Sequence, residues 1–256
     1  MKLVLSARSD TGLRRQANED RFIAARLADG FRADVLDEVL DSSGIFFMVA
    51  DGMGGAAAGD IAAEIAVHSA LAHVLSRKNE SNLENLLSDA LKFSHQEITN
   101  DVKKNPTRRG MGAVATACVL RNESLFFAHA GDTRLYTMEK GSICQKTEDQ
   151  TLVAELLRKG SITLDQARSH PQRNIVLQAL GASEALRPGS GKLTVSSGMS
   201  FLLCSDGLYG MVADEDIETI LGSKKPASEK TAQLIQAANL KGGVDNITAL
   251  IVELSD

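Results

Sequence analysis

The order of strand and helix patterns along this 256-residue chain predicts an α+β fold. Apolar runs of strand length recur in groups, and amphipathic helical patterns lie between the groups. This order departs from the strict alternation of strand and helix that builds a parallel sheet. We therefore expect a layered domain in which two β-sheets form the core and helices cover the outer faces.

Continuous or nearly continuous apolar runs predict the strands. Several of these runs have no polar face, which is typical of strands that are buried on both sides. The runs cover residues 2–7, 21–28, 44–50, 113–120, 124–130, 134–138, 201–205 and 247–254.

Apolar residues spaced by three and four positions predict the helices. The stripe from Leu83 to Ile98 is the clearest, and Thr163 with Gln166 forms a capping-box pattern at the start of another helix. The predicted helices cover residues 60–77, 83–98, 149–159, 163–168, 214–222 and 228–239.

The chain is interpreted as a single domain over residues 1–256, because it contains no internal repeat and no low-complexity tract. A polar stretch at about 145–175 falls between predicted core strands. Polar connections of this kind lie on the surface, so we expect this stretch to form a flap.

Composition narrows the class of protein. Hydrophobic residues make up 43% and charged residues 24% of the chain, which is ordinary for a globular domain. A net charge of −5 predicts no surface for nucleic acid or for an anionic membrane. No apolar run approaches the roughly 20 residues that span a bilayer, and the N-terminus lacks a secretory pattern. We expect a monomeric cytoplasmic protein in which Cys118 and Cys204 are buried and reduced.

The stretch "FFMVADGMGGAAAGD" places Asp51 at the end of a buried strand. Gly52, Gly54 and Gly55 follow it, and glycines let the backbone approach a ligand closely. A tight turn with Asp51 as the turn former is the plain alternative.

Including Asp51, five aspartates lie at the ends or starts of apolar runs. Asp51, Asp132 and Asp206 each come at or just after the end of an apolar run, and Asp20 and Asp245 each come just before one. Clustered carboxylates repel one another unless a cation lies between them. Five acids beside buried strands therefore favour a cation site over five separate turns.

Oxygen ligands without histidine or cysteine favour Mg²⁺ or Mn²⁺ over zinc. The five histidines offer no zinc-binding spacing, and the chain has no GxxxxGK[ST] loop to hold a nucleotide. The chemistry left by this elimination is a pair of metal ions that activates water to hydrolyse a phosphoryl group.

Seven motifs then carry a specific resemblance. In chain order they are "GLRRQANED", "VADGMGGAAAGD", "GMGAVATA", "HAGDTRLY", "SHPQRNIVLQALG", "LLCSDGL" and "GGVDNIT". Over residues 5–254 the chain resembles bacterial metal-dependent Ser/Thr protein phosphatases of the type-2C family. The resemblance implies a four-layer α-β-β-α sandwich with a flap insertion.

The resemblance also implies a centre of two Mn²⁺ or Mg²⁺ ions. Asp51 would bridge both ions, and the carbonyl oxygen of Gly52 would bind one of them. Asp206 and Asp245 would complete the coordination of the other ion, and Asp20 would hold metal-bound water.

Further residues have implied roles around this centre. Asp132 would join Asp206 at a possible third ion, and Glu19 and Asn246 would support the ligands from behind. Arg15, the arginine of an R-x-x-N-E-D motif, would bind the substrate phosphate with its forked guanidinium.

On this resemblance we expect hydrolysis of phosphoserine and phosphothreonine in proteins, opposing a Hanks-type Ser/Thr kinase. A non-catalytic pseudophosphatase that binds phosphoproteins and a metal-dependent phosphodiesterase are the other hypotheses. The chain departs from the family pattern at Met53, where eukaryotic members carry a histidine thought to act as general acid. Ala56 and Gln150 each replace a frequent histidine, and Asp60 replaces a usual glutamate. None of these departures removes an expected metal ligand.

Overall fold

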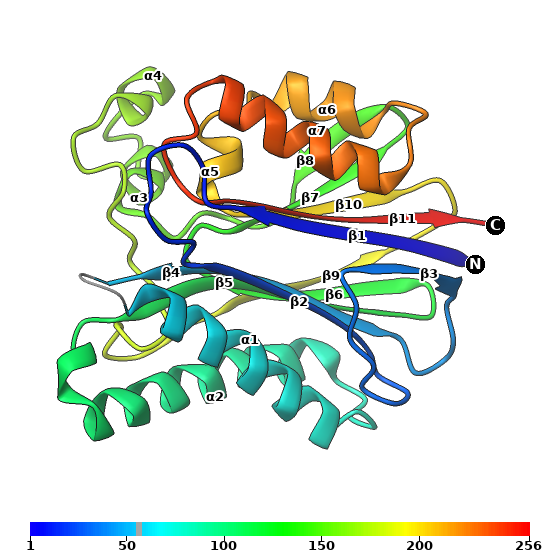
Figure 1. Ribbon diagram of the computed structural model, residues 1–256, viewed down its shortest axis with the longest axis horizontal. Helices are drawn as coiled ribbons and strands as arrows, with labels where there is room; N and C mark the ends of the chain where they lie inside the picture. Colours follow the sequence, from blue (N-terminus) through cyan, green and yellow to red (C-terminus); the bar gives the residue numbers. More distant parts are fainter. Residues whose placement is uncertain (55–57) are drawn as a thin grey trace.

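The computed structural model describes residues 1–54 and 58–256, so Gly55 and Ala56, which the sequence singles out, fall outside the described residues. Figure 1 shows four layers, in which two β-sheets lie face to face between groups of helices. The expected α-β-β-α sandwich is confirmed.

Both sheets are antiparallel. In the first, sheet A, the strand order is β3-β1-β11-β10-β7-β8. Its strands are β1 (Lys2–Asp10), β3 (Val35–Val39), β7 (Arg134–Glu139), β8 (Ser142–Gln145), β10 (Ser200–Cys204) and β11 (Ile247–Ser255). In the second, sheet B, the order is β2-β4-β5-β6-β9. Its strands are β2 (Asp20–Arg26), β4 (Ile45–Met53), β5 (Gly112–Arg121), β6 (Ser124–Ala130) and β9 (Gly189–Thr194).

Strand β4 shows why an unbroken apolar run is needed at the centre of this sandwich. Successive side chains of a strand point to opposite faces. Phe46 and Met48 accordingly pack beneath the helices that cover sheet B. Phe47 and Val49 pack between the two sheets. The strand is therefore buried on both faces, as its sequence predicts.

Two helix pairs close the outer faces (Figure 1). Helices α1 (Gly59–Ser76) and α2 (Leu83–Lys104) cover sheet B, and α6 (Asp214–Leu221) and α7 (Ala227–Leu240) lie against sheet A. The small residues of α1 let it lie close to the sheet, and the leucine stripe of α2 packs into the same core. Cys118 is buried between the sheets and Cys204 beneath α6 and α7, as expected.

The polar flap extends from one end of the sandwich and contains α3 (Leu152–Arg158) and α4 (Leu164–Arg168). An isolated bridge between Thr151 and Val176 closes its base. The capping box of Thr163 and Gln166 is confirmed at the start of α4. Two further short helices are α5 (Asp206–Tyr209) and the 3₁₀ turn η1 (Pro106–Arg108).

Four elements were not predicted from the sequence: β3, β8, β9 and α5. The three strands lie at sheet edges, and exposed or partly exposed side chains recur along each of them, so none carries a continuous apolar run. Helix α5 has only four residues, too few to show a helical period. Within the described ranges, the helices are either too short or too polar to pass through a lipid bilayer.

Candidate metal centre

The apolar layer between the sheets ends in acidic side chains at one edge. In β4, Phe47 and Val49 face sheet A. Because side chains alternate along a strand, Asp51 is the next residue on that same face. Asp20 lies directly opposite Asp51 in the antiparallel register of β2 and β4. Like charges in this position destabilise a sheet, so the pairing needs a compensating partner.

Sheet A brings two hydroxyl groups to the same layer. Ser205 lies two positions after Leu203, and Thr248 lies two positions before Leu250. Both leucines face the layer between the sheets, so the two hydroxyl residues face it as well. Asp20 Oδ2 accepts hydrogen bonds from Ser205 Oγ at 2.6 Å and from Thr248 Oγ1 at 2.7 Å. Asp20 is only 2% exposed, so this carboxylate joins the two sheets inside the molecule.

The other three acids reach this edge from connections between elements. Asp132 lies in the turn between β6 and β7, Asp206 begins α5 directly after β10, and Asp245 precedes β11. Their charges, together with that of Asp20, act on the carboxyl group of Asp51. The structure therefore places all five aspartates that the sequence singled out at one edge of the sandwich, near enough for the other four to act on Asp51.

Burial and mutual repulsion oppose ionisation of four of these acids. Burial raises the pKa of Asp20 to about 7; the two hydroxyl groups lower this pKa, and the charges of Asp206 and Asp245 raise it. Burial, followed by repulsion from Asp20 and other acids, holds the pKa of Asp51 well above its usual range. Burial is also the main cause that raises the pKa of Asp132 to about 7 and that of Asp206 to about 6. Without a cation, these four carboxyl groups keep their protons at pH values where free aspartate has lost them.

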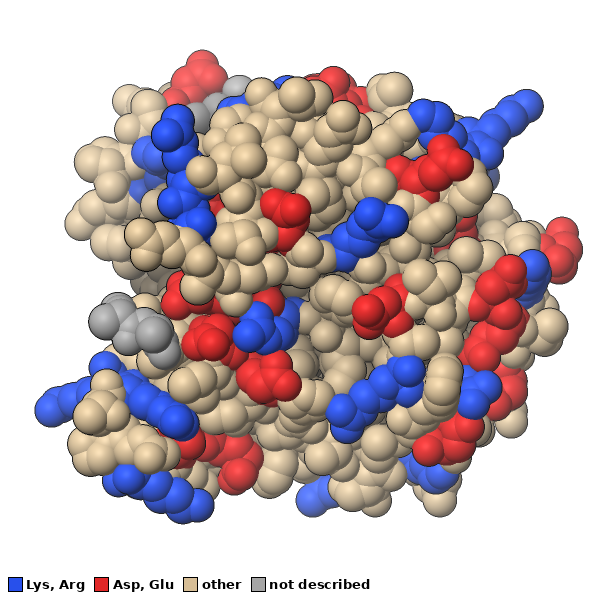
Figure 2. Space-filling model, in the orientation of Figure 1, with Lys and Arg blue, Asp and Glu red and all other residues tan. Residues whose placement is uncertain are grey.

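Arg15 lies at the rim of the cluster and makes an ion pair. Its Nη2 donates a hydrogen bond to Asp245 Oδ2 at 2.7 Å, and this bond raises the pKa of Arg15. Half of the Arg15 side chain is exposed, and an ion pair so exposed contributes only about 0–1 kcal/mol. An incoming anion can therefore compete for Arg15. Figure 2 shows acidic side chains gathered around a basic one on this face.

Asn246 fixes the loop that carries Arg15. Its Oδ1 accepts the backbone N–H of Glu19 at 2.8 Å, and its Nδ2 donates to the carbonyl oxygens of Thr11 and Ala17, each at 2.9 Å. All of its polar side-chain atoms are thus used inside the protein. This arrangement suits a supporting residue, the role that the resemblance implies for it.

The backbone at the end of β4 is closely packed. A Cβ atom on Gly52 would lie 2.1 Å from the carbonyl oxygen of Gly59 and 2.7 Å from that of Glu19. A Cβ atom on Gly59 would lie 2.7 Å from Cδ of Glu19. The two glycines therefore allow β4, the start of α1 and Glu19 to meet, a packing reason beyond the ligand approach that the sequence suggested.

The residues fit a divalent cation, although the binding group is not complete. Each expected ligand presents oxygen, which Mg²⁺ and Mn²⁺ prefer. Within the described part of the chain, Asp20 Oδ1 is buried without a hydrogen-bond partner, and a cation or its water would satisfy it. Over residues 1–54 and 58–256, no three His, Cys, Asp or Glu side chains already form a metal-binding group. Asp245 is instead held by Arg15. A cation would have to draw these ligands together as it binds.

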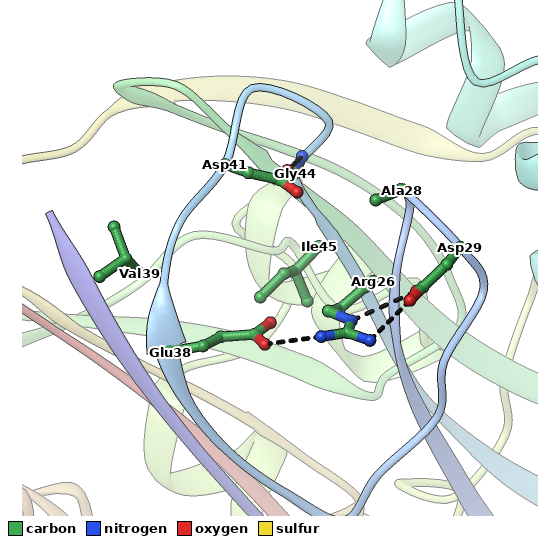
Figure 3. Close-up of a pocket in the computed structure, with 8 residues that line it drawn as sticks. All are labelled: Arg26, Ala28, Asp29, Glu38, Val39, Asp41, Gly44 and Ile45. Atoms are coloured by element: carbon green, nitrogen blue, oxygen red, sulfur yellow. Dashed lines mark hydrogen bonds and ion pairs between the residues drawn. The ribbon is translucent and has the colours of Figure 1, made fainter.

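A separate pocket of about 190 Å³ lies at the other end of β2 (Figure 3). Arg26 donates hydrogen bonds to Asp29 at 2.6 Å and to Glu38 at 3.4 Å across it, as Figure 3 shows. Asp41, also in the lining, accepts the backbone N–H groups of Ser43 and Gly44. None of the expected site residues lines this pocket.

Two supporting residues were missed from the sequence. Each lies two positions from an inward-facing leucine, so the alternation of side chains along a strand predicts that Ser205 and Thr248 also face inward. Nothing in the pattern indicates that Asp20, from the other sheet, lies against them.

Known proteins resemble the chain over most of its length. The model of the protein phosphatase 2C family matches residues 26–244. The serine/threonine phosphatase Stp of Listeria monocytogenes is 36% identical over 224 residues, which cover 83% of this chain and 89% of the relative.

Solved structures agree with this match. A serine/threonine phosphatase of S. agalactiae has a TM-score of 0.88 at 29% identity, covering 99% of this chain and 100% of its own. The catalytic domain of the phosphatase PstP, in complex with two manganese ions, has a TM-score of 0.82 at 32% identity, covering 99% and 100%. With the family model, the near relative and the fold in agreement, the chain belongs to the protein phosphatase 2C family.

Proposed function

We propose that the protein hydrolyses phosphoserine and phosphothreonine in other proteins at a centre of two Mn²⁺ or Mg²⁺ ions, with a third possible at its edge. The observation that carries the proposal is the buried, unpartnered Oδ1 of Asp20 within a cluster of mutually repelling carboxylates. Such a cluster needs a cation. Family membership supports the reaction class, and the manganese complex of PstP supports the choice of metal.

The acids divide into roles by their positions. Asp51 would bridge the two ions, the Gly52 carbonyl would bind one, and Asp206 and Asp245 would hold the other. Bound ions of this kind lower the pKa of water and so supply a nucleophile near neutral pH. Asp20 would hold water through Oδ1, because its Oδ2 is already engaged by two hydroxyl groups.

Arg15 would bind the phosphate group of the substrate. It stands on a loop that Asn246 anchors, and its guanidinium is accessible at the rim. A dianionic phosphate can accept two of its N–H groups and so replace Asp245 as its partner. Release of Asp245 from Arg15 would at the same time free that carboxylate for its ion.

Hydrolysis assays test the proposal against its two rivals. The wild-type protein should release phosphate from para-nitrophenyl phosphate and from a phosphothreonine peptide with Mn²⁺, and should lose this activity in EDTA. Binding of the peptide without turnover would instead indicate a pseudophosphatase. Faster hydrolysis of bis-para-nitrophenyl phosphate than of the monoester would indicate a phosphodiesterase.

The biological setting follows from the same proposal. Phosphorylated proteins, including a Ser/Thr kinase, would be the substrates of a single-domain, monomeric, cytoplasmic enzyme. Phosphoproteomics of a deletion strain identifies the substrates, and light scattering of the purified protein measures its mass in solution.

A further inference from the structure

Gln150 holds the turn that carries Asp132. Its backbone N–H donates to the carbonyl oxygen of Gly131 at 2.9 Å, and its side-chain Oε1 accepts the N–H of Gly131, also at 2.9 Å. Its Nε2 donates to the carbonyl oxygen of Arg187 at 3.2 Å, and its own carbonyl accepts the N–H of Leu177 at 2.7 Å. Gln150 thus ties the turn after β6 to the chain segments that enter and leave the flap.

The turn needs this support because of where it lies. The ladder between β5 and β6 ends at Ala130, so Gly131 stands beyond it. Gly131 is buried with a φ of +96°, and a Cβ atom there would lie 2.1 Å from Val114 Cγ1. Buried backbone polar groups are almost always paired. Here Gln150 pairs with both the N–H and the carbonyl group of Gly131.

Asp149 secures the turn from another side. Its carboxylate accepts hydrogen bonds from Arg134 Nε at 3.0 Å and Nη2 at 2.7 Å. The Arg134 guanidinium lies 3.6 Å from the ring centroid of Tyr209, whose hydroxyl donates to the carbonyl oxygen of Asp132 at 3.0 Å. Two consecutive residues at the base of the flap therefore act on the residues around Asp132.

We propose that Gln150 is a positioning residue, which fixes the turn so that the Asp132 carboxylate is held ready for a divalent cation. The base of the flap would thus influence the Asp132 carboxylate through the hydrogen bonds between Gln150 and Gly131. The proposal rests on the proposed function only in taking Asp132 as a cation ligand. A neutral imidazole nitrogen can accept the same N–H as the amide oxygen, so histidine is a conservative replacement for Gln150.

Calorimetric titration with Mn²⁺ alone tests the proposal without relying on turnover. Gln150→Leu keeps the size of the side chain and removes the acceptor, whereas Gln150→His restores one at about pH 8. Loss of a group that orients a metal ligand costs roughly 10–100-fold in metal affinity. We therefore expect Gln150→Leu to weaken the weakest Mn²⁺-binding step by about tenfold and to leave tighter steps unchanged. Gln150→His should bind like the wild type.

Kinetics give a second readout. The Mn²⁺ concentration for half-maximal hydrolysis of para-nitrophenyl phosphate should rise by the same factor in Gln150→Leu. Its kcat at saturating Mn²⁺ should stay near the wild-type value. A merely destabilised protein would instead lose activity at every Mn²⁺ concentration.

Gln166→Leu is the matched control, because Gln166 lies in the same flap and its Oε1 accepts the N–H of Thr163 at 2.8 Å. It should leave Mn²⁺ binding unchanged. The proposal is overturned if Gln150→Leu binds Mn²⁺ like the wild type, or if Gln166→Leu weakens binding equally. Should Gln150→Leu fail to fold, Gln150→Asn, one methylene shorter, faces the same two criteria. A wild type without phosphatase activity would contradict the proposed function alone, since the titration is independent of it.

Discussion

The acids on strands and the groups on loops are held in different ways. Asp20 and Asp51 face each other in the ladder of β2 and β4, so the sheet sets their separation. Arg15 and the turn at Asp132 depend on side-chain contacts with Asp245 and Tyr209. The strand acids cannot move apart without breaking the ladder, whereas the loop groups can shift. We therefore expect a change at the strand residue Asp51 to abolish function, and changes at Arg15 or Asp132 to scale it.

The largest effect is expected at Asp51. Asp51→Asn removes a charge from the position that we propose bridges the two ions. Because those ions supply the lowered pKa of water, turnover of para-nitrophenyl phosphate should fall by several orders of magnitude. Assays of para-nitrophenyl phosphate hydrolysis over a range of Mn²⁺ concentrations measure this loss of turnover. Near-normal turnover at high Mn²⁺ would contradict the bridging role.

A smaller effect is expected at Arg15. A charge-assisted hydrogen bond contributes about 1.5–3 kcal/mol, so Arg15→Ala should lower kcat/KM roughly 10- to 100-fold. Mn²⁺ binding should persist, because Asp245 is freed rather than lost. Arg14→Ala is the neighbouring control and should change little. If Arg14 proves the more sensitive residue, the assignment of the phosphate-binding arginine is wrong.

Asp132→Ala should raise the requirement for metal without removing the inner ions. The variant loses one carboxylate of the possible third site, so turnover should fall and half-maximal activity should need more Mn²⁺. Calorimetry should still find the two tighter binding steps. Disappearance of tight Mn²⁺ binding would show that Asp132 belongs to the inner pair.

Replacement of the flap separates substrate choice from chemistry. The bridge between Thr151 and Val176 closes the flap, so residues 152–175 can be replaced by a short Gly-Ser linker that leaves Gln150 in place. Activity on phosphoproteins should fall far more than activity on para-nitrophenyl phosphate. Equal losses on both substrates would mean that the flap also builds the site.

The stability of the metal-free protein should depend on pH. The pKa of Asp20 is about 7 in the folded state against 3.8 in the free side chain, so the folded state binds its proton more tightly. The stability from this proton is complete below about pH 4 and is lost as the pH rises to about 7. In EDTA the Tm should therefore be higher at about pH 5.5 than at about pH 8.

A variant and added metal extend these thermal melts. Asp51→Asn relieves repulsion and should narrow the difference between the two melting temperatures in EDTA. Mn²⁺ at about a hundred times its Kd should stabilise the wild type at about pH 8 by about 2.7 kcal/mol. Identical melting curves with Mn²⁺ and with EDTA would refute the view that the acids repel one another.

Interior strands were predictable because burial on both faces leaves an unmistakable apolar run, as in β4 and β5. The edge strands β3, β8 and β9 were not predictable; β9, for example, reads GSGKLT, with polar and small residues in most positions. The flap prediction was correct in placing polar helices there. The sequence did not indicate that Asp149 and Gln150, near the start of the flap, form hydrogen bonds with the segment around Asp132.

The sequence by itself determined which residues end the buried strands, and so which carboxylates lie at one edge of the sandwich. It also determined the family, through seven motifs in order. Only the tertiary structure decided that Asp20 meets the hydroxyl groups of Ser205 and Thr248, which lie 185 and 228 positions away. It also decided that Arg15 holds Asp245, 230 positions away. Periodicity within a segment reports which face is buried, whereas the partner across that face depends on how the sheets stack.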